Sequence, residues 1–277
     1  MSSLKVIKSR IKSVGNTKKI SQTMKLVSSA KYSRSQKELI QARKFGVCPK
    51  LLFDYTELQP NKSPNSQLFV AITSDRGLCG AINSGLSRVI NRTIDKLNNE
   101  QKNLTKLICI GQKNYTILSR LYSDKIILVA SEVGKKSLTF IDAGNIAQEI
   151  MKIMNIFEFS RTRIYYNKFI NAATYKVDYL DLYDKKQINS APKFPLYDGI
   201  NDDTIDCWLE FSITTMIYWI IKESSTSEYA ARMTSMENAT KNASDMIKNL
   251  SLEYNRTRQA VITGELIEII SGASALK

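Results

Sequence analysis

Both ends of this 277-residue chain lack proline, and this constrains the fold more than any other feature. All five prolines fall between Pro49 and Pro195, and only Gly199, Gly264 and Gly272 follow among the glycines. Proline in a helix interior costs about 3 kcal/mol, so segments without it can form very long helices. The sequence therefore predicts a long helix at each end.

The carboxyl-terminal segment has the hydrophobic period of a coiled coil. Nine positions follow strict three-four spacing, and seven of them are apolar or aromatic. They are Met233, Met236, Thr240, Ala243, Ile247, Leu250, Tyr254, Thr257 and Val261. If the last segment is helical throughout, roughly 65 residues span about 100 Å. A globular domain alone does not need such a length.

The amino-terminal arm carries a matching apolar stripe. The stripe begins at three-four-three spacing with Leu4, Ile7, Ile11 and Val14, and it resumes one position out of phase at Ile20, Met24 and Val27. Residues 15–17 mark the discontinuity and predict an irregularity in the helix. A single helix in water cannot hide such a stripe. We therefore expect the two terminal segments to pair as a long antiparallel coiled coil.

The middle of the chain alternates strands and helices. Short apolar or β-branched runs occur at 67–73, 105–110, 125–130 and 163–166, with helical stretches near 81–100, 112–122 and 140–155. This alternation favours a mainly parallel, Rossmann-like α/β sheet, with 174–183 as an antiparallel edge strand. The predicted organisation is an N-terminal coiled-coil helix over 1–58, a central α/β domain over 66–190 and a C-terminal coiled-coil helix over 205–277.

Positive charge is concentrated at the amino terminus. The formal net charge is +14, and residues 1–50 contain 13 Lys or Arg against a single acid, Glu38. Such an arm is typical of binding to nucleic acid, to anionic lipid or to an acidic protein partner, and it is also typical of an import signal. Nucleic acid is disfavoured because aromatic residues are not interleaved with the charges and no nucleic-acid fold signature is present. The apolar period through Val27 favours a permanent packing role over a removable import signal.

The residue types present argue against catalysis and metal binding by this chain. Histidine is absent, and the four cysteines, Cys48, Cys79, Cys109 and Cys207, are far apart. A zinc site and the Ser/His and Cys/His nucleophile pairs are therefore disfavoured. No run of 18 apolar residues occurs, so no transmembrane helix is predicted. We expect no cofactor, metal site or catalytic residue.

A short loop, Ser74–Gly80 (SDRGLCG), follows an expected strand and precedes an expected helix. This is the position at which α/β proteins bind phosphates. The loop matches neither GxxxxGK[ST] nor GxGxxG, and no acidic residue lies about 20 positions further on at the end of a second strand. A structural turn or an exposed docking loop is therefore favoured over a nucleotide site.

Four separated segments occur in the order of a known family. They are Leu4–Lys31, the SDRGLCG loop, Ser227–Ala243 (SEYAARMTSMENATKNA) and Asn255–Ala273 (NRTRQAVITGELIEIISGA). Together they resemble the F-type ATP synthase γ family. Residues 223–226 (ESST) and 255–270 are similar to the animal mitochondrial pattern, and the inserted redox loop of the chloroplast branch has no counterpart. Gly264, where the family often has Lys or Gln, and Lys18, which interrupts the first stripe, are departures that concern helix packing.

The resemblance implies a mechanical role. The terminal helices would form an asymmetric shaft within a ring of α and β subunits that hold the nucleotide sites. The α/β domain would stand on a proton-driven c-ring, beside the small central-stalk subunits δ and ε. The chain would transmit torque at the matrix side of the mitochondrial inner membrane without catalysing a reaction. It would bind no nucleic acid and would meet the membrane only through these partners.

The resemblance also implies residues that contact partners. On the last helix, Arg258 and Gln259 are expected to bind β-subunit loops, and Ile269–Leu276 to form an apolar pivot. In the SDRGLCG loop, Arg76 is expected to contact a partner. On the first helix, the expected contacts are three lysines that would face acidic β-subunit loops and a methionine at which the family's two helices meet: Lys18, Lys19, Lys25 and Met24.

Overall fold

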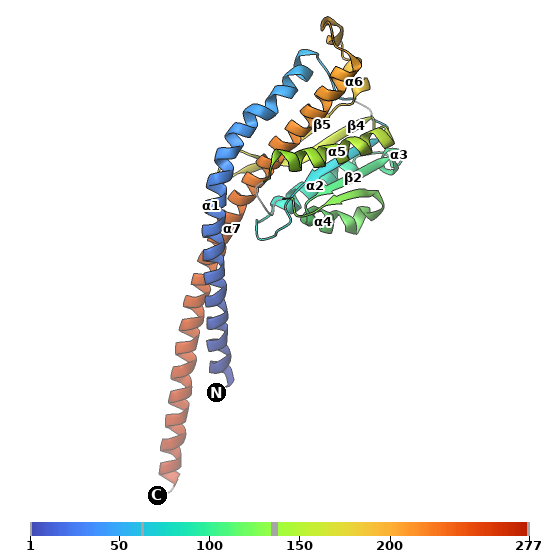
Figure 1. Ribbon diagram of the computed structural model, residues 1–277. Coiled ribbons are helices and arrows are strands. Elements are labelled where there is room, and N and C mark those ends of the chain that lie inside the picture. Colours follow the sequence, from blue (N-terminus) through green and yellow to red (C-terminus); the bar gives the residue numbers. More distant parts are fainter. Residues whose placement is uncertain (1, 62–63, 134–137, 276–277) are drawn as a thin grey trace. The chain divides into compact units, whose positions relative to one another are not determined.

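The computed structural model describes residues 2–61, 64–133 and 138–275, which divide into two compact units. The helix-pair unit comprises the described residues of 1–28 and 233–277, and the sheet unit comprises those of 29–232. Two long helices, α1 (Ser2–Tyr55) and α7 (Asp202–Ala275), contribute residues to both units (Figure 1). Helix α1 has 54 residues and α7 has 74. Helix α7 lacks proline, as predicted, whereas α1 continues past Pro49 to Tyr55.

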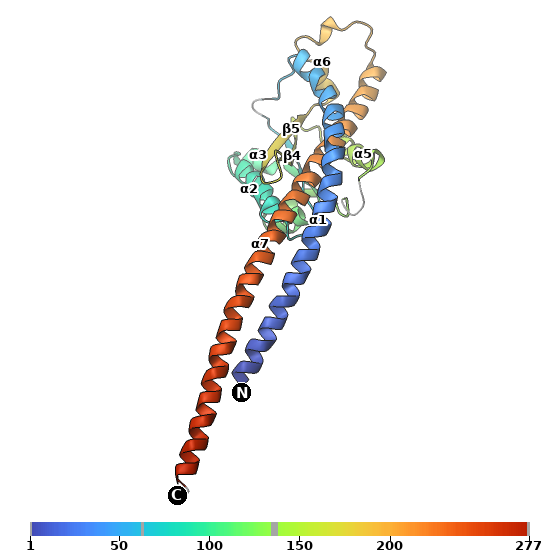
Figure 2. The ribbon, with the colours of Figure 1, turned by 90° about the vertical axis from the view of Figure 1, so that its left-hand side faces the viewer.

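In the helix-pair unit, α1 and α7 lie side by side and antiparallel in both views (Figures 1 and 2). On α7, all nine positions of the predicted seam from Met233 to Val261 are buried or half-buried. The sequence period therefore identifies the face that α7 turns toward α1. The expected antiparallel coiled coil is confirmed.

On α1 the seam keeps a single phase, so the predicted discontinuity is wrong. The helix runs unbroken through residues 15–17. After Val14 the half-buried or buried seam positions are Lys18, Ser21, Lys25 and Ser28. In contrast, Ile20 is 61% exposed and Val27 is 53% exposed. Polar residues can occupy this seam because serine is small, and because a lysine stem covers apolar surface while its ammonium group reaches water.

The sheet unit is built on five strands in the order β3-β2-β1-β4-β5. Four strands are parallel: β1 (Gln67–Ile72), β2 (Thr105–Ile110), β3 (Ile126–Ala130) and β4 (Arg161–Phe169). Strand β5 (Tyr175–Leu182) pairs antiparallel with β4 at the edge, as predicted. In register, Gln67 of β1 lies opposite Thr105 of β2 and Arg161 of β4.

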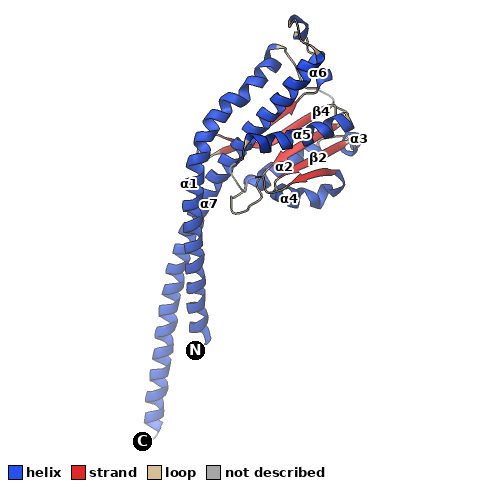
Figure 3. Ribbon diagram, viewed as in Figure 1, coloured by secondary structure: helices blue, strands red, loops and turns tan. Residues whose placement is uncertain are grey.

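Helices cover both faces of this sheet (Figure 3). On one face, Phe69 and Ala71 of β1 belong to a core with residues of α2 (Ile82–Asp95) and α4 (Gln112–Tyr122). On the other face, alternate residues of β1 pack in a core with α5 (Phe140–Phe157), α1 and α7. All six residues of β1 are buried, which is typical of a parallel strand covered on both sides. The expected Rossmann-like α/β architecture is therefore present.

Four short elements complete the described chain: α3 (Asn99–Asn103), η1 (Ser123–Lys125), α6 (Lys185–Asn189) and η2 (Phe194–Leu196). The stretch expected as one helix over 81–100 is thus two, α2 and α3. The strand order changes direction between the parallel strands β1 and β4. Strands β2 and β3 lie on one side of β1, and β4 and β5 lie on the other side. Ligands of doubly wound folds bind at such a reversal, beyond the carboxyl ends of the strands.

Candidate functional site

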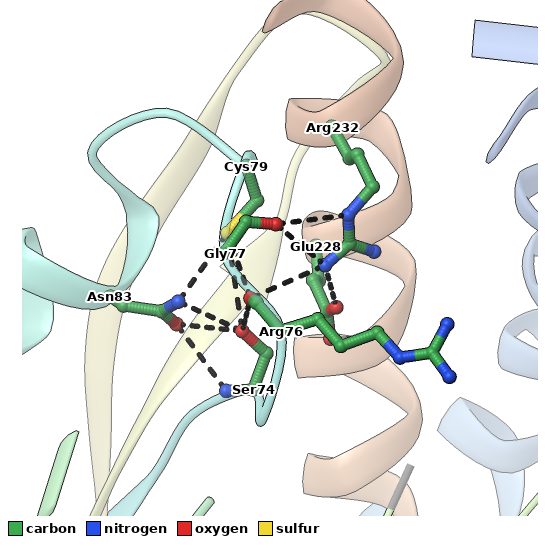
Figure 4. A network of polar contacts seen from close by, with 7 residues as sticks. All are labelled: Ser74, Arg76, Gly77, Cys79, Asn83, Glu228 and Arg232. Atoms are coloured by element: carbon green, nitrogen blue, oxygen red, sulfur yellow. Dashed lines mark hydrogen bonds and ion pairs between the residues drawn. The ribbon is translucent and has the colours of Figure 1, made fainter. Parts of the chain in front are cut away.

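The SDRGLCG loop begins two residues beyond the carboxyl end of β1, next to the reversal of strand order. Helix α7 contacts this loop through Arg232. The guanidinium of Arg232 donates hydrogen bonds of 3.4 Å to the main-chain oxygens of Arg76 and Gly77 (Figure 4). The contact uses carbonyl oxygens of the loop, whereas a phosphate cradle uses main-chain N–H groups. The geometry favours a docking loop over a nucleotide site.

A half-buried carboxylate holds Arg232 in place. Glu228, one turn earlier on α7, accepts a hydrogen bond of 2.5 Å from the same guanidinium. The side chains of Arg232 and Glu228 are only 7% and 19% exposed. Burial raises the pKa of Glu228, against the opposing effect of the Arg232 charge. The pair fixes the direction of the guanidinium, because a buried charge pair is stable only in good geometry.

Polar side chains inside the loop fix its backbone from the other side. The amide of Asn83 donates to Ser74 Oγ at 2.8 Å and to Cys79 Sγ at 3.3 Å, and Ser74 Oγ donates to the Arg76 carbonyl at 2.9 Å. Asp75 accepts a 2.9 Å bond from the main-chain N–H of Gln112, the first residue of α4. Burial raises the pKa of the Cys79 thiol, whose sulfur lies within hydrogen-bond distance of the Arg76 carbonyl and the Asn83 amide.

The clamped backbone leaves two large side chains at the loop surface. Arg76 is exposed, and Figure 4 shows its side chain directed away from the Ser74–Asn83 cluster. Leu78 is 60% exposed and has a left-handed φ of 64°, a conformation that few non-glycine residues adopt. Sequence reasoning identified Arg76 but missed Leu78, Glu228 and Arg232. The available signal for Leu78 was a large apolar residue within a loop of small and polar ones.

The expected contact residues of the helix-pair unit fall into two groups. Arg258 and Gln259 of α7 and Lys19 of α1 are exposed. Half-buried residues on the seam side of α1 are Lys18, Met24 and Lys25. Lys25 has an intramolecular partner, because its ammonium lies 2.9 Å from the carboxylate of Glu237 on α7.

The apolar end of α7 is exposed in the described residues. Ile269 is 71% exposed and Ile270 is 56% exposed. The last residue of the expected pivot, Leu276, lies outside the described residues.

Comparison with known proteins identifies the family. The family model described as ATP synthase matches residues 3–276. The mitochondrial ATP synthase γ subunit of Drosophila melanogaster is 44% identical over 277 residues, which cover 100% of this chain and 91% of the relative. The chain belongs to the ATP synthase γ-subunit family. The corresponding subunit of the F(1) complex of Rattus norvegicus is 41% identical over 273 residues, 99% of each chain.

Solved structures agree with the assignment to the γ family. A chain in the cryo-EM structure of the central stalk and c-ring of Tetrahymena thermophila mitochondrial ATP synthase is 27% identical, with a TM-score of 0.68. The match covers 79% of this chain and 99% of that one. A chain from the OSCP/F1/c-ring structure of Euglena gracilis mitochondrial ATP synthase shares the fold, with a TM-score of 0.81 at 20% identity over 99% of this chain and 95% of that one.

As a γ-family member, the chain is a non-catalytic subunit of the central stalk of a rotary ATP synthase. Among the described residues, no group of three or more His, Cys, Asp and Glu side chains could hold a metal ion. Over the same residues, none of the helices has both the length and the apolar character that a membrane span needs.

Proposed function

We propose that this γ-family chain is the rotor shaft of a mitochondrial F-type ATP synthase, which passes torque between a proton-driven c-ring and a ring of α and β subunits. The observation that carries the proposal is the antiparallel pairing of the two ends of the chain in the helix-pair unit. Relatives with the same full-length sequence pattern are mitochondrial γ subunits, and a structural relative is part of a central stalk with a c-ring.

The partners in this proposal are the α and β subunits, the small central-stalk subunits δ and ε, and the c-ring. The chain works at the matrix side of the inner membrane and meets that membrane only through these partners. Residues 1–58 and 205–277 act as the shaft, and 66–190 act as the domain that stands on the c-ring. Neither nucleic acid nor a cofactor takes part.

The two sides of the shaft differ in charge, and this difference supports a directional role. Through residue 28, α1 contains seven Lys or Arg and no acid, whereas the chain from residue 208 onward has seven Lys or Arg and eight Asp or Glu. Charge complementarity steers orientation more than it adds affinity. Rotation of such a shaft presents a cationic side and a nearly neutral side in turn to each β subunit, and so alters its nucleotide affinity.

Seven residues are proposed as contacts with partner subunits. Exposed polar groups that suit acidic or polar loops are Arg258, Gln259, Lys19 and Arg76. The half-buried Lys18, Met24 and Lys25 contribute at the edge of the seam. Lys25 serves two roles in this scheme, because its ammonium also pairs with Glu237.

Affinity purification of the tagged chain from mitochondria tests the proposal. We expect α and β subunits to accompany it, and we expect the purified chain alone not to hydrolyse ATP. The basic arm offers nucleic acid as the competing partner. Recovery of nucleic acid in a salt-sensitive complex without α and β subunits would show that the rotor assignment is wrong.

Charge reversal at Arg258 tests the contact assignment. In the assembled enzyme, Arg258→Glu should lower ATP-driven proton pumping several-fold, because a charge-assisted contact to a β-subunit loop becomes a repulsion. Circular dichroism should be unchanged, since Arg258 is exposed. Arg256→Glu is the matched control, with the same charge change on an exposed neighbour. Equal pumping in both variants and the wild type would remove Arg258 from the contact set.

A further inference from the structure

Strand β4 continues beyond the end of its neighbour β1. The pairing of β1 with β4 stops at Ala71 and Tyr165, whereas β4 runs to Phe169. On its other side, β4 remains paired with β5 as far as Phe169 and Tyr175. Asn167 and Phe169 are only 2% and 7% exposed. Their main-chain groups on the β1 side therefore need partners that no strand supplies.

Side chains of the two long helices provide these partners. Ser224 Oγ accepts a 3.3 Å bond from the N–H of Asn167, and Ser227 Oγ donates a 3.0 Å bond to its carbonyl. At Phe169, the carboxylate of Glu223 accepts from the N–H at 2.9 Å. Arg43 of α1 donates to the carbonyl of Phe169 at 2.6 Å. All four main-chain groups of the two residues are thus bonded to side chains of α1 and α7.

Glu223 joins three elements through one buried carboxylate. Its side chain is 1% exposed, and it accepts bonds of 2.6 and 3.0 Å from the Arg43 guanidinium. With the bond from the Phe169 N–H, the bond of 3.0 Å that the indole N–H of Trp219 donates is the fourth. The Arg43 side chain is 40% exposed, so loss of Arg43 would leave the buried Glu223 carboxylate without its counter-charge, which is destabilising. The carboxylate therefore ties α1, α7 and β4 to one geometry.

We propose that Arg43, Glu223, Ser224 and Ser227, here termed the polar docking strip, form the joint through which torque passes between the sheet and the long helices. Apolar burial is non-directional, so apolar surfaces resist sliding weakly. Hydrogen bonds weaken steeply when donor and acceptor are misaligned, so a row of them resists shear. The strip members are positioning residues. This inference rests on the rotor function proposed above.

The test uses the whole ATP synthase in sealed vesicles, with Ser224→Ala and Ser227→Ala combined. The variant keeps the charges of Arg43 and Glu223 and removes two bonds to β4. The matched control combines Ser212→Ala and Thr215→Val. Ser212 and Thr215 are buried hydroxyl residues of α7 whose bonds, to the carbonyls of Leu209 and Phe211, stay within the helix.

Two quantities are measured on each enzyme: amide exchange at Asn167, and protons pumped per ATP hydrolysed. In the strip variant we expect exchange at Asn167 to rise roughly tenfold, since each lost bond favours the undocked state. We also expect the pumping ratio to fall several-fold while ATP hydrolysis continues. A purely structural role would change stability without changing this ratio, and the control variant should keep both wild-type values.

Three outcomes would overturn the inference: unchanged exchange at Asn167, faster exchange with a wild-type pumping ratio, or an equal loss of coupling in the control. If the double variant does not assemble, the single variants Ser224→Ala and Ser227→Ala must show smaller losses of the same kind. A wild-type chain that fails to couple in this assay would refute the rotor function itself. Normal coupling in wild type and strip variant alike would refute only the joint.

Discussion

At the scale of single residues, Gly46 determines how closely α1 and α7 approach in the sheet unit. A Cβ built at Gly46 would lie 2.3 Å from the Cβ of Trp219, which is closer than two such atoms can come. Glycine in a helix interior is about 1 kcal/mol less favourable than alanine. The close approach of Trp219 therefore explains why a glycine is present at this position.

We predict that Gly46→Ala lowers the free energy of unfolding by about 2 kcal/mol, because the new methyl group forces the two helix backbones apart. Gly15→Ala is the control. Nothing lies within 4 Å of a Cβ at Gly15, so this change should raise stability by up to about 1 kcal/mol through helix propensity. Both values can be measured by urea denaturation. A Gly46→Ala variant as stable as the wild type would contradict this account of the helix crossing.

A second residue-scale prediction concerns Asp181 on β5. Its carboxylate lies 2.8 Å from the Arg163 guanidinium and 3.1 Å from that of Arg161, and its side chain is 11% exposed. Burial alone would raise the pKa of Asp181, but hydrogen bonds from Arg163 and Arg161 outweigh it and the pKa lies below its ordinary value. A depressed folded-state pKa adds stability that is complete above the unfolded value and is lost as the pH falls.

Asp181→Asn should therefore lower the free energy of unfolding by about 3 kcal/mol near neutral pH, because two half-buried arginines lose their counter-charge. The difference from wild type should stay constant down to about pH 4 and shrink as the pH falls further. Asp178→Asn on the same strand is the control. The pair of Asp178 with Lys168 is more exposed, so its loss should cost less than about 1 kcal/mol. If the difference in free energy of unfolding between Asp181→Asn and wild type did not change with pH, the proposed depression of the Asp181 pKa would be wrong.

At the scale of elements, periodicity predicted α7 better than α1. The nine seam positions of α7 were predictable because most are apolar on a continuous three-four repeat. On α1 the apolar stripe shifted at Ile20, but the burial did not. Two helices that wind around each other keep one three-four seam between them, whatever residues occupy it. The seam therefore passes through Lys18 and Ser21. Because both residues are polar, a hydrophobicity pattern does not identify them as seam positions.

Strand β4 shows that a sequence pattern also predicts the bounds of a strand incompletely. Sequence reasoning placed it at 163–166, whereas the strand extends over Arg161–Phe169. Polar residues such as Asn167 do not indicate a buried strand. Asn167 is nevertheless buried, because Ser224 and Ser227 of α7 bond to its main chain. A segment of α7 that lies 57 residues away in sequence thus bonds to the main chain of β4 near its end.

At the scale of the whole molecule, the two units differ in their cores. Among the described residues of the helix-pair unit, the buried apolar side chains are Ile7, Met236 and Ala243. The sheet unit instead has two continuous cores, one on each face of the sheet. Local stability follows the density of buried apolar contacts.

We therefore predict that amides of the isolated chain exchange faster in 233–275 than in β1 and α2. Hydrogen exchange followed by mass spectrometry measures this directly. Binding of α and β subunits should slow exchange in 233–275, because a partner that binds the folded helices stabilises them by mass action. Equal protection of the two units in the free chain would show that the helix pair needs no partner for its stability.

The sequence by itself determined the long terminal helices, the alternating strands and helices, and the family. These follow from local properties: the positions of proline, the hydrophobic period and short motifs. Only the tertiary structure decided the phase of the α1 seam, the Arg232 contact with the SDRGLCG loop and the docking of Glu223 against the end of β4. Each of these depends on which distant segment supplies a hydrogen-bond partner or covers a surface, and a local pattern does not contain that information.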